Sequence, residues 1–139
     1  MKIKSAIIDL YNNEENQGMR CIQDIIKEAD ERYTDVDLKY DIFDTRYKGE
    51  IPDMSYDIFI SSGGPGDPFD GKGKKKKKKY FKLLDKIWTN NQNKTKKKKF
   101  IFFICHSFQI MARYFELGDV IPRNSKSFGI VPIHKTELG

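Results

Sequence analysis

Apolar and polar residues alternate along the first third of the chain in three distinct segments. The β-branched, apolar run Ile3–Leu10 predicts a strand. Apolar residues then recur at helical spacing between Met19 and Ala29, which predicts a helix with one buried face. Over residues 36–42 apolar and polar side chains alternate, as expected for a strand with one solvent-facing side near the edge of a sheet.

The same order of strand and helix returns in the second half of the chain. Asp57–Ser61 predicts a third strand, and Tyr80–Trp88 predicts a helix whose aromatic residues enter the core. Phe100–Ile104 is apolar throughout, the pattern of a strand that is buried on both faces of a parallel sheet. Ser107–Glu116 predicts a final helix, for which Leu117-Gly118 supplies a C-terminal stop.

Alternation of strands with helices is typical of an α/β fold. With right-handed crossovers it predicts a doubly wound, mostly parallel sheet with helices on both faces, and Val120–Ile121 and Gly129–Ile133 are expected to add two short strands. A chain of 139 residues is long enough for one hydrophobic core, so we expect residues 1–139 to form a single domain. In such sheets ligands bind beyond the carboxyl ends of the strands. The segments at those ends are residues 12–18, 62–69 and 104–108.

Cys105 stands where the fourth predicted strand passes into a helix. A cysteine presented at such a tight turn, next to a helix N-terminus that favours a thiolate, has the properties of a catalytic nucleophile. The alternative is a structural role, because free cysteines most often behave as small apolar residues of the core. The position of Cys105 alone does not decide between these interpretations.

The glycine-rich loop after the third predicted strand bears on that choice. Gly63 and Gly64 carry no side chain that would block approach to the backbone. The N–H of Gly64 and that of His106, first in the next helix, are therefore candidate donors to an oxyanion formed at Cys105. An ordinary tight turn would account for the glycines on their own, but the loop and the cysteine together favour an acyl-transfer site.

Two motifs at these positions have counterparts in a known family. The segment Ser62–Pro68, SGGPGDP, resembles the oxyanion-strand motif of class I glutamine amidotransferases. Phe103–Gln109, FICHSFQ, resembles their nucleophile elbow, which usually reads Gly-x-Cys-x-Gly-His-Gln. The tail Ser127–Thr136 is similar to the strand that follows in GMP-synthase-like members. The resemblance thus extends over nearly the whole chain.

This resemblance implies a flavodoxin-like fold and the hydrolysis of L-glutamine through a γ-glutamyl thioester on Cys105. The ammonia released would pass to a synthetase domain or subunit, and neither a metal nor a cofactor is implied. Among the motif positions, Gly64 and His106 correspond to the oxyanion hole, and Gly63 to a residue that binds the substrate. Gln109, on the first turn of the predicted helix, is a candidate to hold the glutamine or the elbow, and the alternative is an amide on the helix surface.

The chain departs from the family motif at several positions. Phe103 and Ser107 stand where the elbow usually has glycines, and Phe108 replaces the usual histidine. The family's catalytic histidine and glutamate form a His-x-Glu motif farther downstream than Gly139, so the amidotransferase domain is expected to be incomplete at its C-terminus. His134, the one later histidine, is expected to be structural or on the surface.

Two other functions stay open at this point. In a related family of Cys-His peptidases and deglycases, a catalytic histidine directly follows the nucleophile, and Cys105-His106 resembles that pair. The other alternative is a non-catalytic binding module, a degenerate amidotransferase domain that binds a partner or glutamine without turning it over.

The formal net charge of +6 comes from two lysine-rich stretches. Residues 72–79 and 94–99 contain 12 lysines, and the rest of the chain is acidic. Neither stretch has the interleaved aromatic residues of a groove that binds single strands, so we expect solvated loops and no nucleic-acid partner.

The compartment follows from the apolar runs and the cysteines. The longest apolar run, residues 100–105, is far shorter than a membrane span, and the N-terminus lacks the cleavage site of a secretory signal. Cys21 and Cys105 lie far apart, without the spacing of a metal site or a disulfide framework. A cytoplasmic protein with no membrane partner is therefore expected.

Overall fold

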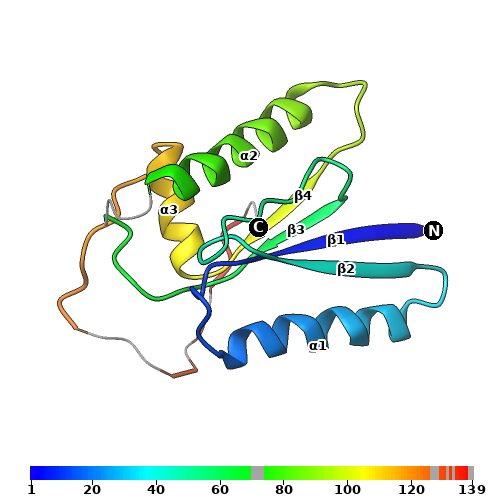
Figure 1. Ribbon diagram of the computed structural model, residues 1–139, viewed down its shortest axis with the longest axis horizontal. Coiled ribbons are helices and arrows are strands. Elements are labelled where there is room, and N and C mark those ends of the chain that lie inside the picture. Colours follow the sequence, from blue (N-terminus) through cyan, green and yellow to red (C-terminus); the bar gives the residue numbers. More distant parts are fainter. Residues whose placement is uncertain (70–73, 126–128, 131, 133, 138–139) are drawn as a thin grey trace.

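Four parallel strands form one sheet at the centre of the fold (Figure 1). They are β1 (Lys2–Asp9), β2 (Asp37–Asp44), β3 (Ile58–Ser61) and β4 (Phe100–Phe103), in the spatial order β2-β1-β3-β4. This computed structural model describes residues 1–69, 74–125, 129–130, 132 and 134–137. All neighbouring pairs of strands run parallel, which confirms the predicted α/β class.

Three helices cover the two faces of the sheet. α1 (Gln17–Arg32) lies on one face, and α2 (Lys74–Gln92) and α3 (His106–Tyr114) lie on the other (Figure 1). Successive side chains of a strand point to opposite faces, so Ile8 of β1 packs under α2 whereas Ile7 packs under α1. Helices on both faces make this a doubly wound sheet, and its strand order is flavodoxin-like.

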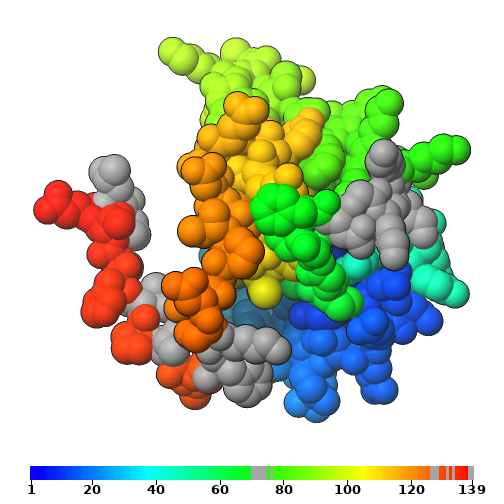
Figure 2. Space-filling view, turned by 90° about the vertical axis from the view of Figure 1, so that its left-hand side faces the viewer, coloured from blue at the N-terminus to red at the C-terminus, as the bar shows by residue number. Residues whose placement is uncertain are grey.

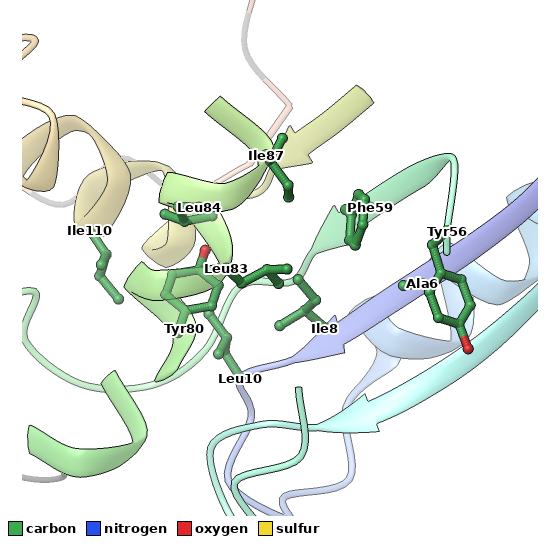
Figure 3. Packing of buried hydrophobic residues seen from close by; sticks show 10 residues of the cluster. All are labelled: Ala6, Ile8, Leu10, Tyr56, Phe59, Tyr80, Leu83, Leu84, Ile87 and Ile110. Atoms are coloured by element: carbon green, nitrogen blue, oxygen red, sulfur yellow. The ribbon is translucent and has the colours of Figure 1, made fainter. Parts of the chain in front are cut away.

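The larger hydrophobic core lies between the sheet and the α2–α3 layer (Figure 3). Phe59 of β3 is fully buried there, and Leu83 and Leu84 of α2 are 2% exposed. Burial of each side chain of this size stabilises the fold by about 1.5 to 3 kcal/mol relative to exposure. The remaining buried members of this core are Ala6, Ile8, Leu10, Tyr56, Tyr80, Ile87 and Ile110.

The carboxyl ends of three strands meet at one edge of the sheet. Ile8 of β1 is in register with Ser61 of β3, and Ser61 is in register with Phe103 of β4. The segments that follow these strands therefore begin side by side, at the edge where doubly wound folds bind their ligands.

β4 is less buried than its sequence predicts. Phe100 and Phe102 are 66% and 63% exposed, whereas Ile101 and Phe103 pack against the larger core. β4 is the last strand of the described sheet, and the cluster around α1 includes Ile104 but neither exposed phenylalanine. The predicted burial of this strand on both faces is thus wrong for one face.

α2 begins earlier than its apolar pattern predicts. It starts at Lys74 and so takes in most of the first lysine-rich stretch, which was expected to be a loop. Lysine is a good helix former, and an exposed helical turn solvates its ammonium groups as well as a loop does. Residues 94–98 are exposed between α2 and β4, as predicted.

Trp88, expected in the core, is 54% exposed and stacks on Phe115 with ring centroids 5.3 Å apart.

The end of α3 also differs from the prediction. The helix ends at Tyr114, and Glu116 rather than Gly118 takes the left-handed backbone conformation, with φ of 53°. Val120–Ile121 is not a strand. The strand expected at Gly129–Ile133 includes residues 131 and 133, which lie outside the described residues.

Candidate functional site

Cys105 occupies a strained backbone conformation between β4 and α3. Its φ of 51° and ψ of −108° lie outside the regions that L residues ordinarily adopt. Such a conformation costs on the order of 1 to 3 kcal/mol and persists where the surrounding structure enforces it, often at active sites. A sharp strand-to-helix turn that exposes its central side chain is the geometry of a nucleophile elbow, and Cys105 is exposed.

Figure 2 looks onto the carboxyl edge of the sheet, where this turn lies. The yellow surface of the start of α3 is bordered by blue residues of the β1–α1 segment and by green residues of the segment between β3 and α2. Orange residues that follow α3 complete the border. Segments far apart in the sequence therefore surround the start of α3.

Ser107 ties the turn to the end of β3. Its side chain is fully buried, its Oγ lies 2.8 Å from the Ser61 carbonyl oxygen, and the Ile104 N–H donates to the same Oγ at 2.9 Å. The Ile104 N–H also lies 3.0 Å from the Ser61 oxygen. Ser107 thus fixes the backbone directly before Cys105.

The glycine loop approaches both the turn and the end of β1. A β-carbon on Gly63 would lie 3.6 Å from Cys105 Cβ and 3.0 Å from the Tyr11 hydroxyl. A β-carbon on Gly64 would lie 2.4 Å from the Leu10 carbonyl oxygen, a separation that no real side chain tolerates. Close approach of the loop to β1 therefore requires glycine at position 64, and a side chain at position 63 would contact the candidate nucleophile.

Three backbone donors near the thiol have no acceptor. Within the described part of the chain, the N–H groups of Gly63, Gly64 and His106 donate no hydrogen bond. These N–H groups are therefore available to a ligand bound beside Cys105. An oxyanion formed on a substrate bound to Cys105 needs donors of this kind.

His106 is buried, at 5% exposure. Burial is the main cause that lowers the pKa of His106 below its ordinary value, the positive charges of Arg46 and Lys77 lower it further, and Asp67 opposes them. The imidazole is therefore neutral at pH 7. No hydrogen bond joins Cys105 to it, so the Cys-His pair of the peptidase alternative is adjacent in sequence without being paired in space.

Gln109 belongs to the first turn of α3. Its backbone N–H donates to the Cys105 carbonyl oxygen at 3.1 Å, and its side chain is half-buried. The predicted site residues thus lie at one edge of the sheet: Gly63 and Gly64 in the loop beside Cys105, and His106 and Gln109 on the first turn of the helix. His134 is exposed, as expected of a surface residue.

Two residues at this edge were missed by the sequence patterns. The Tyr11 hydroxyl lies against both Gly18 and Gly63. Burial is the main cause that raises the pKa of Tyr11, and electrostatic interactions with Cys105 and Asp9 raise it further, so its phenol keeps its proton at neutral pH. The place of Tyr11 directly after the first predicted strand was the one available signal. Arg46, which follows β2, reaches the loop after β3 through its guanidinium.

Comparisons of the chain with protein-family models, with curated proteins and with solved structures find no match. Among the described residues, no group of three or more His, Cys, Asp or Glu side chains is arranged to hold a metal ion. No helix in the described ranges is both long and apolar enough to cross a bilayer. What the site can do must therefore be argued from its own geometry.

Proposed function

We propose that this protein hydrolyses the side-chain amide of L-glutamine with Cys105 as the nucleophile, in the manner of a class I, GMP-synthase-like glutamine amidotransferase. The strained backbone of Cys105 carries the proposal, because a cysteine that only filled the core would not need φ of 51° or an exposed thiol. The motif resemblance of residues 62–68 and 103–109 supplies the reaction class.

The chemistry uses the residues that meet at this edge. The Cys105 thiolate attacks the carboxamide carbon of glutamine, and the electron pair of the C=O bond moves onto its oxygen. The N–H groups of Gly64 and His106 stabilise that oxyanion; loss of one such donor typically costs about 2.7 to 4 kcal/mol of transition-state stabilisation. Collapse of the oxyanion breaks the C–N bond, ammonia leaves, and water then hydrolyses the γ-glutamyl thioester to glutamate.

Proton transfer to the leaving ammonia needs a general acid. The resemblance implies a histidine of a His-x-Glu motif for this role, and residues 1–139 contain no such motif. The same resemblance implies a synthetase domain or subunit that receives the ammonia. Gly63 and Gln109 are proposed to contact the bound glutamine.

Glutamate and ammonia release from glutamine tests the proposal. Cys105→Ala should abolish release, whereas Cys21→Ala should leave it unchanged, because Cys21 is an exposed residue of α1 and belongs to neither motif segment. Release that persists in folded Cys105→Ala protein would refute the assignment. Glutamine that slows alkylation of Cys105 without being hydrolysed would instead indicate the non-catalytic binding module.

One observation favours the Cys-His peptidase or deglycase alternative. His106 is buried and neutral directly beside Cys105, so its imidazole is able to accept a proton once a substrate reorders the site. That alternative predicts that His106→Gln removes all turnover of peptide or glycated substrates. In the amidotransferase reaction only the backbone N–H of His106 is used, so His106→Gln should retain most of the glutaminase activity.

A further inference from the structure

Arg46 bridges the ends of two strands that are not its own. It follows β2, and its Nη1 donates one hydrogen bond to the Leu10 carbonyl oxygen at 3.2 Å and another to the Pro65 carbonyl oxygen. Leu10 directly follows β1, and Pro65 lies in the loop that follows β3. One half-buried guanidinium thus joins three segments at the carboxyl edge of the sheet.

The loop is shaped to receive this side chain. Gly66 has a left-handed φ of 108°, and a β-carbon there would lie 2.9 Å from Arg46 Nη2. The guanidinium therefore packs against the α-carbon of Gly66 while it bonds to the preceding carbonyl. A planar group with several fixed donors suits this arrangement, whereas a lysine ammonium presents a single point charge.

The same contacts determine where Gly64 lies. Gly64 packs against the Leu10 carbonyl oxygen, which is also the oxygen that accepts from Arg46. Arg46 therefore bonds to the Leu10 carbonyl against which Gly64 packs, and also to Pro65, the residue after Gly64. The position of the Gly64 N–H therefore depends on how firmly these contacts hold the loop.

We propose that Arg46 is the residue that positions the Gly63–Gly66 loop so that its N–H groups meet the oxyanion formed at Cys105. This inference rests on the proposed glutaminase reaction. Displacement of a catalytic group by 1 Å is enough to cost about 100-fold in rate. Ser62 also ties the start of the loop to β1 through the Leu10 N–H, so loss of Arg46 removes the bridge to β1 that acts beyond Ser62, at Pro65. The positive charge of Arg46 also acts on His106, so charge and bridging must be separated in the test.

The test compares Arg46→Met and Arg46→Lys with Arg20→Met, which removes an exposed positive charge from α1. In Arg46→Met the kcat for glutamine should fall by roughly 30- to 100-fold with KM changed less than about 3-fold, because the loop acts in the transition state. Arg46→Lys, which keeps the charge without the planar bridge, should fall in between. The rate of Cys105 alkylation by iodoacetamide should stay within about 2-fold in every variant, because that reaction needs no oxyanion donors.

A measurement that does not depend on glutaminase activity separates the two proposals. In the 139-residue chain, ¹⁵N relaxation of the Gly63, Gly64 and Gly66 amides should show greater mobility in Arg46→Met and Arg46→Lys than in Arg20→Met. Unchanged amide mobility would overturn the role of Arg46, as would greater mobility with an unaltered kcat. A kcat loss that merely parallels slower Cys105 alkylation would do the same. Wild-type protein that includes a His-x-Glu motif and still lacks glutaminase activity would refute the proposed function, while the relaxation data would still show whether Arg46 holds the loop.

Discussion

A β-carbon on Gly63 would stand 3.6 Å from Cys105 Cβ, so the loop after β3 and the turn after β4 lie side by side at the carboxyl edge of the sheet. The two residues are far apart in the sequence, and parallel pairing of β3 with β4 brings them together. This proximity places candidate oxyanion donors beside a candidate nucleophile.

Gly64 should not tolerate a side chain. Its β-carbon would lie 2.4 Å from the Leu10 carbonyl oxygen, so Gly64→Ala must move the loop or β1 and should lower the free energy of unfolding by about 1 to 3 kcal/mol. Urea unfolding measures this loss. The matched control is Gly118→Ala, where a β-carbon meets nothing within 4 Å. Equal stability of the two variants would contradict the packing described.

Gly63 and Tyr11 should be energetically coupled. A β-carbon at Gly63 would lie 3.0 Å from the Tyr11 hydroxyl, so Gly63→Ala should destabilise the protein, and Tyr11→Phe should relieve part of that loss by removing the oxygen. In a double-mutant cycle the coupling between contacting residues is commonly about 0.5 to 3 kcal/mol. Additive effects of the two substitutions on urea unfolding would show that the hydroxyl lies elsewhere.

Ser107 should contribute to stability through its hydroxyl. Ser107→Ala leaves the Ile104 N–H and the Ser61 carbonyl with one partner fewer in a fully buried site. Because these two groups still bond to each other, the loss should be about 0.5 to 1.5 kcal/mol. Thr34→Ala, at an exposed hydroxyl, serves as the control and should change little. Cys105 alkylation should also accelerate or slow in Ser107→Ala, because the turn loses its anchor to β3. Wild-type stability and thiol reactivity in this variant would argue against that anchor.

His106 should make the protein less stable at mildly acidic pH. Burial lowers its pKa in the folded state, so below about pH 6.5, the ordinary histidine value, the unfolded chain binds a proton that the folded protein does not. Stability is therefore full above that pH and falls as the pH is lowered towards the folded pKa. Asp53 and Asp57 have lowered pKa values and lose their contribution only at lower pH.

The measurement is the urea midpoint between pH 7.5 and pH 5.5. Wild-type protein should lose stability over this range more steeply than His106→Gln. His134→Gln, at an exposed position, should retain the wild-type slope. Identical slopes for wild type and His106→Gln would show that the imidazole is not buried in solution.

Local patterns predict the helices and strands of this fold well, and they predict poorly what covers each element. Phe100 and Phe102 are as apolar as Ile101, yet only the latter packs into the core, because burial of a strand depends on which helix crosses it. The predicted burial of Trp88 is wrong for the same reason, because its side chain stacks on Phe115 and is 54% exposed.

The residues of the candidate site could also be predicted only in part. Cys105 and Gly63 were predictable because each follows a strand in a recognisable motif. Arg46 was not, since β2 is followed by no motif and the reach of its side chain to Leu10 and Pro65 depends on the order of the strands. The role of Ser107 was also hidden, because a hydrogen bond to Ser61 requires the β3–β4 pairing.

The most direct test of the central claim is site-specific labelling of Cys105 by a diazoketone analogue of L-glutamine, which alkylates a thiolate only after binding as glutamine does. Mass spectrometry of wild type, Cys21→Ala and Cys105→Ala identifies the modified residue, with iodoacetamide as a reagent that needs no binding site. Labelling of Cys105 in wild type and Cys21→Ala, with slowing by excess L-glutamine, is the predicted result. Folded protein whose Cys105 reacts with iodoacetamide but not with the glutamine analogue would contradict the account.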